Sequence, residues 1–272
     1  MFLCAYGAGR RIGEGAISDD DSSDPTTSLF SDNAPFINAE EWLMQLDYAE
    51  SKDTSKNKMG SGKFDQIKRL LIDLLPDVSD IRITVDKSPR YKAKVEFDTL
   101  DGWVSIDDIS FGYRTLSAWM IDFASRLFEK FPKSKNPLAE PAVCLVDEID
   151  LHLHPKWQRD IISYLTERFP ATQFIFTAHS PLIVQAAADA NLAVLRREGD
   201  HVVIDQSPTG IVGWRIDQII TSDLFGIASA RGPQFDALVQ EREGLLSKSR
   251  LTKKNRARIE DIKKNHQHHA GR

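Results

Sequence analysis

Hydrophobic and polar residues follow two kinds of pattern along the chain, one of which predicts strands and the other helices. Unbroken apolar runs predict strands covered on both faces, whereas apolar residues three and four positions apart predict helices with one buried face. Strands are expected at residues 2–6, 81–85, 92–97, 103–106, 142–146, 173–177, 192–196 and 202–204. Helices are expected at residues 39–48, 64–75, 112–131, 155–169 and 181–188, and in a tail from about residue 234. This order predicts an α/β fold with a parallel-sheet core, a small β meander and a helical C-terminal tail.

The chain divides by composition into three segments. Residues 1–76 form a partial N-terminal lobe, in which residues 12–32 contain aspartates, serines and threonines but no base. Such a stretch cannot bury enough apolar surface to offset its ordering entropy, so a mobile loop is expected there. Residues 77–210 hold the meander and the α/β core. Residues 211–272 form the tail, for which we expect a solvated helical hairpin, with docking to a partner or to a phosphate backbone as the alternative.

Composition narrows the class of protein. With 41% hydrophobic and 28% charged residues, the 272-residue chain can bury a core, so disorder throughout is excluded. Its net charge of −5 lacks the overall positive excess typical of nucleic-acid-binding domains. The two cysteines, Cys4 and Cys144, exclude a disulfide framework and a four-cysteine zinc site, and suit a reducing cytosol. No apolar run approaches the ~18 residues of a membrane span and no leader precedes the first strand, so we expect a cytoplasmic protein with no membrane partner.

Two acids follow the apolar run at residues 142–146, and a histidine follows the next such run. Asp147 and Glu148 stand at a strand's carboxyl end, where the ligand crevice of a parallel sheet lies. Two carboxylates there are costly to desolvate unless a cation or a positioned water uses them. Because neighbouring strands lie about 5 Å apart, His179, after residues 173–177, is expected in the same crevice. For the acids alone, a strand that merely leaves the core for a polar loop is the alternative.

Three stretches of this region resemble motifs of the ABC-type ATPases, in the branch that contains SMC-like and OLD-like AAA ATPases. Val143–Glu148 resembles the Walker B strand of these ATPases. Ile149–Pro155, which follows it, resembles their D-loop region. The H-switch resembles Thr177–Pro181, with His179 in place of the switch histidine. The resemblance spans about residues 103–205 and implies that the parallel sheet is the core of an ABC-type P-loop ATPase, in its C-terminal portion.

A fourth stretch, Ile109–Tyr113, resembles a degenerate ABC signature at the start of a helix. Ser110 and Gly112 match its serine and second glycine, whereas Phe111 stands where a glycine is usual. A serine and exposed N–H groups at a helix N-terminus can cradle a phosphate. In this family the signature acts on ATP bound by the other protomer of a head-to-tail dimer. The resemblance therefore implies a homodimer or a partner ATPase half.

The resemblance also implies cofactors and roles for individual residues. ATP and Mg²⁺ would bind in the crevice, where Asp147 would hold the metal and Glu148 would act as the catalytic base. His179 would contact the γ-phosphate, and Asp150, in the D-loop region, would contact the nucleotide.

Stretches outside this core narrow the resemblance further. Tyr6–Arg11, Ser28–Phe30, Glu41–Leu43 and Val212–Gly226 are similar to segments of bacterial ATPases found beside HNH-type nucleases in anti-phage systems of the Septu kind, some linked to retrons. This similarity implies a role in antiviral defence in which nucleotide-dependent dimerisation gates an HNH-type nuclease partner.

The sequence contains no P-loop, GxxxxGK[ST], which an ATPase of this class needs. Gly60–Lys63 comes nearest, but Asn57 replaces the first glycine, Phe64 replaces the Mg²⁺-binding serine or threonine, and no strand precedes it. The glycines of Gly7–Gly13 lead into an acidic loop instead of a helix, so a dinucleotide fold is not expected. We therefore expect the chain to be the C-terminal part of a longer ATPase that hydrolyses little or no ATP in isolation.

Two other functions remain open from the sequence. A degenerate cassette could serve as a non-enzymatic scaffold that binds a partner through its C-terminal helices. Less favoured is a metal-dependent nuclease that uses Asp147, Glu148 and His179 directly, which Mg²⁺- or Mn²⁺-dependent DNA cleavage without nucleotide would reveal. The sequence does not decide whether DNA is bound.

Overall fold

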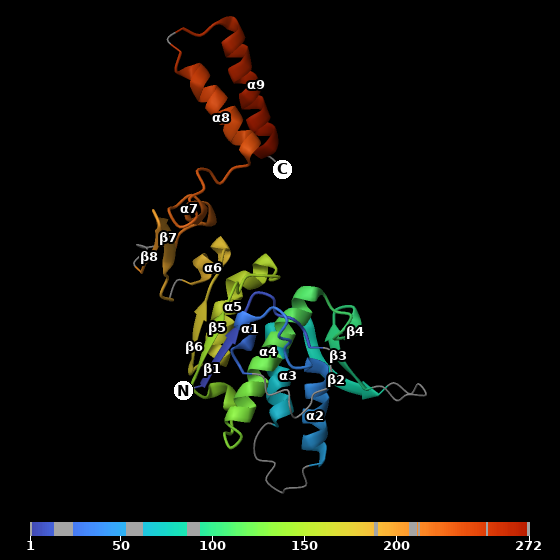
Figure 1. Cartoon of the computed structure of the whole chain (residues 1–272). Coiled ribbons are helices and arrows are strands. Elements are labelled where there is room, and N and C mark those ends of the chain that lie inside the picture. The colour runs from blue at the N-terminus through green and yellow to red at the C-terminus, as the bar shows by residue number, and fades with distance from the viewer. Residues whose placement is uncertain are drawn as a thin grey trace. The chain divides into compact units, whose positions relative to one another are not determined.

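The computed structural model divides the chain into two compact units, Met1–Ala187 and Ala188–Arg272 (Figure 1). It describes residues 2–13, 24–52, 62–85, 93–187, 190–206, 211, 213–248 and 250–270. The division into three segments that composition suggested stays a prediction.

A three-stranded parallel sheet forms the centre of the first unit. Its strands are β1 (Phe2–Tyr6), β5 (Ala142–Val146) and β6 (Thr172–Phe176), in the order β1-β5-β6. Cys4 lies beside Cys144 in the register of β1 and β5, and both thiols are buried and free. The parallel sheet predicted from the apolar runs is confirmed.

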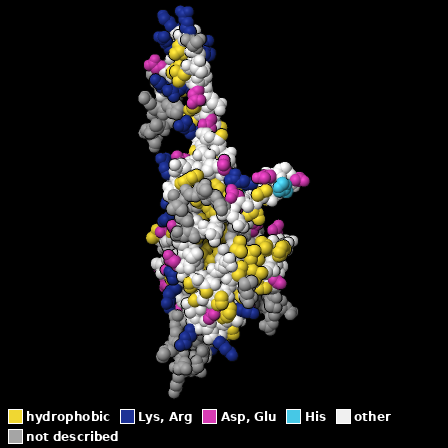
Figure 2. All heavy atoms as spheres, turned by 90° about the vertical axis from the view of Figure 1, so that its left-hand side faces the viewer, with side chains coloured by type: hydrophobic (Ala, Val, Ile, Leu, Met, Phe, Trp, Pro, Cys, Tyr) yellow, Lys and Arg dark blue, Asp and Glu magenta, His cyan; other side chains and the backbone are white. Residues whose placement is uncertain are grey.

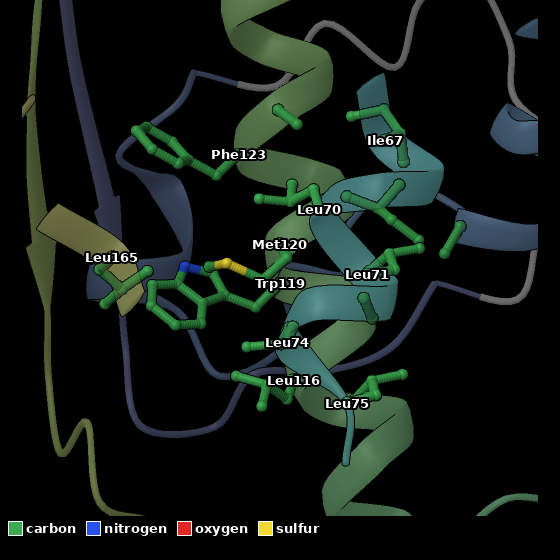
Figure 3. Packing of buried hydrophobic residues seen from close by; sticks show 14 of the residues in the cluster. Ile67, Leu70, Leu71, Leu74, Leu75, Leu116, Trp119, Met120, Phe123 and Leu165 are labelled. Carbon is green, nitrogen blue, oxygen red and sulfur yellow. The ribbon is translucent and has the colours of Figure 1, made fainter. Parts of the chain in front are cut away.

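Helices cover one face of this sheet. They are α2 (Ala39–Lys52), α3 (Lys63–Leu74), α4 (Phe111–Lys130) and α5 (Pro155–Arg168). α4 is nearly surrounded by other elements, and the apolar stripe of α3 packs along it. Figure 3 shows this core, in which the labelled residues are Ile67, Leu70, Leu71, Leu74, Leu75, Leu116, Trp119, Met120, Phe123 and Leu165. Pro155 is the first residue of α5, as expected, because proline lacks the N–H that would be unpaired there.

A buried carboxylate joins the sheet to this helical layer. Asp122 of α4 is almost fully buried and accepts a hydrogen bond from the Tyr6 hydroxyl (2.9 Å). It also accepts from the backbone N–H of Ile37 (2.9 Å) and from Arg126 Nε (2.7 Å). Burying a charge is tolerated here because three donors satisfy it.

An antiparallel meander flanks the helices. It comprises β2 (Val78–Val85), β3 (Ala93–Thr99) and β4 (Gly102–Ser105), in that order. The turn before β4 requires a glycine, because Gly102 has a φ of +99°. The predicted meander is confirmed.

Three short helices complete the first unit: α1 (Thr27–Phe30), the 3₁₀ turn η1 (Pro137–Ala139) and α6 (Pro181–Ala186). The expectation of a loop over residues 12–32 was wrong at α1, which Asp24 stabilises by accepting from the Thr26 backbone N–H and hydroxyl. The most acidic part of that expected loop, residues 14–23, lies outside the described residues.

The second unit begins with an antiparallel hairpin of β7 (Val194–Glu198) and β8 (His201–Asp205), as predicted. A short helix that the sequence did not predict, α7 (Ile216–Ile220), follows it. The tail forms the expected helical hairpin of α8 (Pro233–Leu246) and α9 (Lys253–Ala270). Arg258 of α9 binds both carboxylate oxygens of Glu241 on α8 (2.9 Å each). No helix within the described residues is long and apolar enough to cross a membrane.

Candidate functional site

Strands β5 and β6 end side by side at one rim of the sheet. Val146 and Phe176 are register partners. The residues that follow them, Asp147 and Thr177, are in direct contact, because the Thr177 hydroxyl donates to Asp147 Oδ1 (2.5 Å). The same hydroxyl accepts from the backbone N–H of Glu148 (2.7 Å). The predicted meeting of the two strand ends is confirmed.

The chain turns sharply at Glu148, immediately after β5. Its φ of +48° lies in the left-handed region, which costs a non-glycine residue about 1–3 kcal/mol. Arg10, just beyond β1, stabilises this turn: its Nη2 donates to the carbonyl oxygens of Asp147 (2.9 Å) and Glu148 (2.6 Å). Its Nη1 lies 3.5 Å from the carbonyl oxygen of Leu151.

Arg10 is buried beneath the acids, with 5% of its surface exposed. Burial lowers the pKa of Arg10 to about 10, while the charges of Asp150, Asp147 and Glu148 oppose that shift. The guanidinium therefore stays protonated at neutral pH. Its carbon lies 5.6 Å from the centre of the Trp119 ring, in cation–π geometry.

The loop after β6 brings His179 to the same rim. His179 is exposed, two residues beyond Thr177, and its backbone N–H donates to Asp150 Oδ1 (3.2 Å). The next residue, Ser180, caps α6 and donates to Gln158 of α5 (2.6 Å). The structure thus brings Asp150 and His179 into contact.

Ser110 and Gly112 lie at the N-terminus of α4, against the loop that follows the acids. The Ser110 hydroxyl caps its own helix by accepting from the Tyr113 backbone N–H (3.4 Å). A Cβ on Gly112 would lie 2.6 Å from the carbonyl oxygen of His152, so only glycine fits there. The Phe111 ring meets the His152 ring edge-on, 5.0 Å between centres. The predicted site residues therefore form two groups, which the loop from residue 149 to 153 connects.

The chemistry of the rim suits a hydrated magnesium ion. No three His, Cys, Asp or Glu side chains in the described part of the chain form a cluster that could hold a metal unaided. Mg²⁺ does not need one, because it commonly takes one or two carboxylates together with waters and substrate phosphates. Asp147 is half-buried, and Thr177 orients it through Oδ1. These residues fit the ion.

Two residues of this rim were not assigned a role from the sequence. Arg10 was visible only as a base in a glycine-rich stretch after the first strand, and its contacts link positions 137 and 138 residues apart. Thr177 lies inside the segment that resembles the H-switch, in which only the histidine has an expected role. A hydroxyl directly after a buried parallel strand, as at Thr177, or a base within four residues of one, as at Arg10, is the signal that could have identified both.

Comparison with known proteins identifies the family. A model described as "AAA domain, putative AbiEii toxin, Type IV TA system" matches residues 9–185, well over half of the chain. The chain belongs to this AAA_21 family.

Curated relatives share the sequence over most of this chain. "Septu protein PtuA" of Bacillus mycoides (strain KBAB4) is 28% identical over 236 residues, which are 86% of this chain and 30% of the relative. "Retron Vc95 probable ATPase" of Vibrio cholerae serotype O1 biovar El Tor is 31% identical over 195 residues, or 71% of this chain and 37% of the relative. "Retron Ec83 probable ATPase" of Escherichia coli is 30% identical over 203 residues, or 74% and 35%. The chain thus spans about a third of the length of these relatives.

Solved structures of SMC ATPases resemble the chain only distantly. One, described as "Structural biochemistry of ATP-driven dimerization and DNA stimulated activation of SMC ATPases", matches 61% of this chain and 91% of its own, with a TM-score of 0.42 and 17% identity. "SMC head domain from Thermotoga maritima" matches 61% and 52%, with a TM-score of 0.38 and 17% identity. Likenesses of this size carry no functional argument.

Proposed function

We propose that this chain supplies the Walker B, switch-histidine and signature parts of an ABC-type ATPase, and that a P-loop-bearing segment completes its nucleotide site. One observation carries the proposal: Asp147 and Glu148 follow β5 while Thr177 and His179 follow the adjacent parallel strand β6. Charged and polar groups gathered at such a rim suit a metal-bound triphosphate. Membership of an AAA family supports the nucleotide as ligand.

Each residue of the rim has a distinct role in this proposal. Asp147 holds Mg²⁺, which when bound neutralises charge on the β- and γ-phosphates. Glu148 accepts a proton from the attacking water, and His179 donates a hydrogen bond to the γ-phosphate. Thr177 keeps the Asp147 carboxylate and the Glu148 backbone in fixed relation through its two hydrogen bonds. Asp150 fixes the backbone at His179 by accepting its N–H.

Ser110 and Gly112 act in trans in this proposal, on ATP bound by a second protomer. Their position at the N-terminus of a 20-residue helix supplies backbone N–H groups and a favourable dipole for phosphate. The Ser110 hydroxyl would then exchange its bond to the Tyr113 N–H for one to the nucleotide. The assembly would be a homodimer, or a dimer with a partner ATPase half.

The relatives suggest the biological setting. Their names place them in Septu and retron systems, and two are called ATPases. We propose that this chain serves in bacterial anti-phage defence in the cytoplasm, where ATP-driven dimerisation gates an HNH-type nuclease partner.

Phosphate release measured with and without a complementing polypeptide tests the enzymatic part. The complement is the polypeptide encoded immediately upstream of this reading frame, if it carries a GxxxxGK[ST] motif. We expect little hydrolysis by the chain alone, hydrolysis by the complex, and loss of hydrolysis with retained ATP binding in Glu148→Gln. Glu140→Gln, at the opposite end of β5, is the matched control and should leave the rate unchanged.

Three results would contradict the proposal. Full hydrolysis by the chain alone that Glu148→Gln abolishes would show that no complement is needed. An upstream sequence without a P-loop would favour the scaffold. DNA cleavage with Mg²⁺ but no nucleotide would favour the nuclease.

A further inference from the structure

A single glutamine side chain contacts both loops that follow the strands of the site. Gln158 is half-buried and is the fourth residue of α5. Side chains in a helix lean toward its N-terminus, so this one reaches back over the first turn to the loop that follows β5. Its Nε2 donates to the carbonyl oxygens of Asp150 (3.3 Å) and Leu153 (3.0 Å) in that loop. Its Oε1 accepts from the hydroxyl of Ser180 (2.6 Å), so one amide group joins this loop to the loop that follows β6.

The chemistry of these partners determines how the amide is oriented. Carbonyl oxygens only accept hydrogen bonds, so the part of the Gln158 amide that meets them must be its NH₂ group. The amide oxygen then faces Ser180, whose hydroxyl donates to it and accepts from the backbone N–H of Leu182 (3.1 Å). Ser180 is buried, with 9% of its surface exposed. Because both ends of the amide and the hydroxyl have partners, this network holds its members in one arrangement.

The contacts of Gln158 close a ring of hydrogen bonds that includes the backbone of His179. The His179 N–H donates to Asp150 Oδ1 (3.2 Å), while the carbonyl oxygen of the same aspartate accepts from Gln158. Gln158 accepts in turn from Ser180, which directly follows His179 in the chain. We call these four residues the clasp. It holds His179 from both sides, by its own N–H and by the next residue.

The position of His179 in the chain explains why such support matters. Thr177 is held to β5, because its N–H donates to the Val146 carbonyl oxygen (3.0 Å). His179 lies two residues further along and is exposed. A group that acts on a substrate must keep its place closely, since a displacement of about 1 Å can cost about 100-fold in rate. The strand alone therefore does not fix the place of His179, and the clasp supplies the missing restraint.

We propose that Gln158 is a positioning residue of the candidate site. It fixes the loop after β6 to the loop after β5 and thereby sets where the His179 ring lies relative to Asp147 and Glu148. It acts through His179 and not on the nucleotide itself. This inference rests on the proposed function for the task of His179, whereas the clasp rests on the hydrogen bonds of Gln158 alone.

The link between the two loops is made of neutral groups, which distinguishes it from the surface charges. Figure 2 shows Lys and Arg side chains interspersed with Asp and Glu side chains over one face of the molecule. Salt screens interactions between such exposed charges. The bonds of the Gln158 amide to a hydroxyl and to two carbonyl oxygens depend little on salt. The clasp should therefore hold His179 equally well at low and at high ionic strength.

Backbone dynamics of the chain without nucleotide test the clasp. In ¹⁵N relaxation measurements we expect the His179 amide to have an order parameter of about 0.85, at about 0.05 M and at about 1 M salt alike. In Gln158→Met it should fall below about 0.6, because methionine has a similar length but cannot donate to the carbonyl oxygens. The order parameter of Thr177, which is bonded to β5, should not change.

Two further variants make this measurement specific. Gln45→Met is the matched control: Gln45 is exposed on α2, where its amide donates to Glu41 (3.2 Å), and its substitution should leave His179 unchanged. Gln158→Glu keeps an acceptor for Ser180 but has no donor for the two carbonyl oxygens, so His179 should again become mobile. Circular dichroism and the melting temperature check that each variant folds.

Phosphate release by the complex with the upstream-encoded polypeptide tests the positioning role. We expect Gln158→Met to lower kcat about 10- to 100-fold and to change KM for ATP less than about threefold, because the ring position matters most in the transition state. Gln45→Met should leave both constants unchanged. If Gln158 only stabilised α5, its substitution would lower the melting temperature and leave kcat unchanged.

The outcomes separate this inference from the proposed function. A mobile His179 in the unchanged chain, or a rigid one in Gln158→Met, overturns the clasp whatever the complex hydrolyses. A His179 that becomes mobile in Gln158→Met, together with no hydrolysis by the unchanged complex, supports the clasp and contradicts the ATPase. Full hydrolysis by a complex in which this variant has made His179 mobile overturns the positioning role and leaves the ATPase standing.

Discussion

The Nη2 atom of Arg10 lies 2.6 Å from the carbonyl oxygen of Glu148 and holds that residue in a left-handed turn. The bond connects the loop after β1 to the loop after β5, and together with the bond from the same atom to Asp147 it holds the carbonyl groups of both acids toward the buried guanidinium. A buried cation thus sets the conformation of the loop from which both carboxylates project. The two acids depend on a residue that is distant in sequence.

Replacing Arg10 by methionine should destabilise the fold and loosen this loop. The substitution removes the Arg10 donor from the carbonyl groups of Asp147 and Glu148. The Glu148 carbonyl keeps its bond from the Leu151 N–H (2.9 Å), so the main cost falls on the Asp147 carbonyl, at about 1–3 kcal/mol for a buried group left unpaired. We expect urea unfolding to show a loss of about 2–4 kcal/mol. Arg11→Met is the matched control, because Arg11 is exposed, and its effect should stay within about 0.5 kcal/mol. Equal losses in both variants would contradict the role given to Arg10.

The substitutions Gly112→Ala and Gly244→Ala should change the free energy of unfolding in opposite directions. At Gly112 the new Cβ would meet the His152 carbonyl oxygen at 2.6 Å, so either α4 or the loop must shift. We expect a loss of about 1–3 kcal/mol in unfolding free energy. Gly244 lies inside α8 with open space around its Cβ position, where alanine should raise helix stability by about 0.5–1 kcal/mol. Thermal unfolding followed by circular dichroism would detect both signs.

The buried pair of Asp122 and Arg126 should show strong coupling. Asp122→Leu leaves the guanidinium of Arg126 buried without its carboxylate, and we expect a loss of about 3–5 kcal/mol. Asp122→Leu with Arg126→Met removes both charges and should recover part of that loss, although the Tyr6 hydroxyl and the Ile37 N–H still lose their acceptor. At the half-exposed pair of Asp73 and Arg168, Asp73→Leu should cost less than about 1 kcal/mol. A double variant no more stable than the single one would refute the coupling.

Alkaline pH should destabilise the protein through its buried thiols. Burial raises the pKa of Cys4 from 9.0 to about 12, and burial also raises the pKa of Cys144. Between pH 9 and 12 the unfolded chain has therefore lost the Cys4 proton while the folded chain keeps it. Because the folded state then binds more protons, the unfolding free energy falls as pH rises, by about 1.4 kcal/mol per pH unit for each such group.

Cys4→Ala should make the fall of the unfolding free energy with pH less steep, by about 1.4 kcal/mol per pH unit between pH 9 and 12. Below pH 8 thiols are protonated in both states, so the variant should show the same pH dependence as the unchanged protein there. Unfolding free energies measured from pH 7 to 11 provide the comparison. Identical slopes for the two proteins would show that Cys4 does not contribute.

The sequence predicted the parts of the fold that local pattern determines. The apolar run from Ala142 to Val146 and the run before Thr177 were identified as adjacent parallel strands, and their ends carry the acids and the histidine. The amphipathic spacing of α3 and the proline at the start of α5 were equally informative. In these elements a single periodicity or terminal signal decides the structure.

What the sequence did not predict depends on tertiary contacts. Nothing near Arg10 in the sequence shows that its guanidinium reaches carbonyls more than 130 positions away. The left-handed turn at Glu148 is equally hidden, because glutamate has no preference for it. Helix α7 has only five residues, too few for a helical period to become visible.

Gly112 packs against His152 so closely that no side chain fits between the start of α4 and the strand-end loop, and the Phe111 and His152 rings are in contact beside it. A tilt of the helix toward the loop would displace the loop, because closely packed elements have little free space between them. In the proposed dimer, a protomer that grasps its neighbour's ATP through Ser110 would therefore shift the backbone beside its own acids. Hydrolysis of the ATP beside Asp147 and of the ATP beside Ser110 would then be coupled rather than independent.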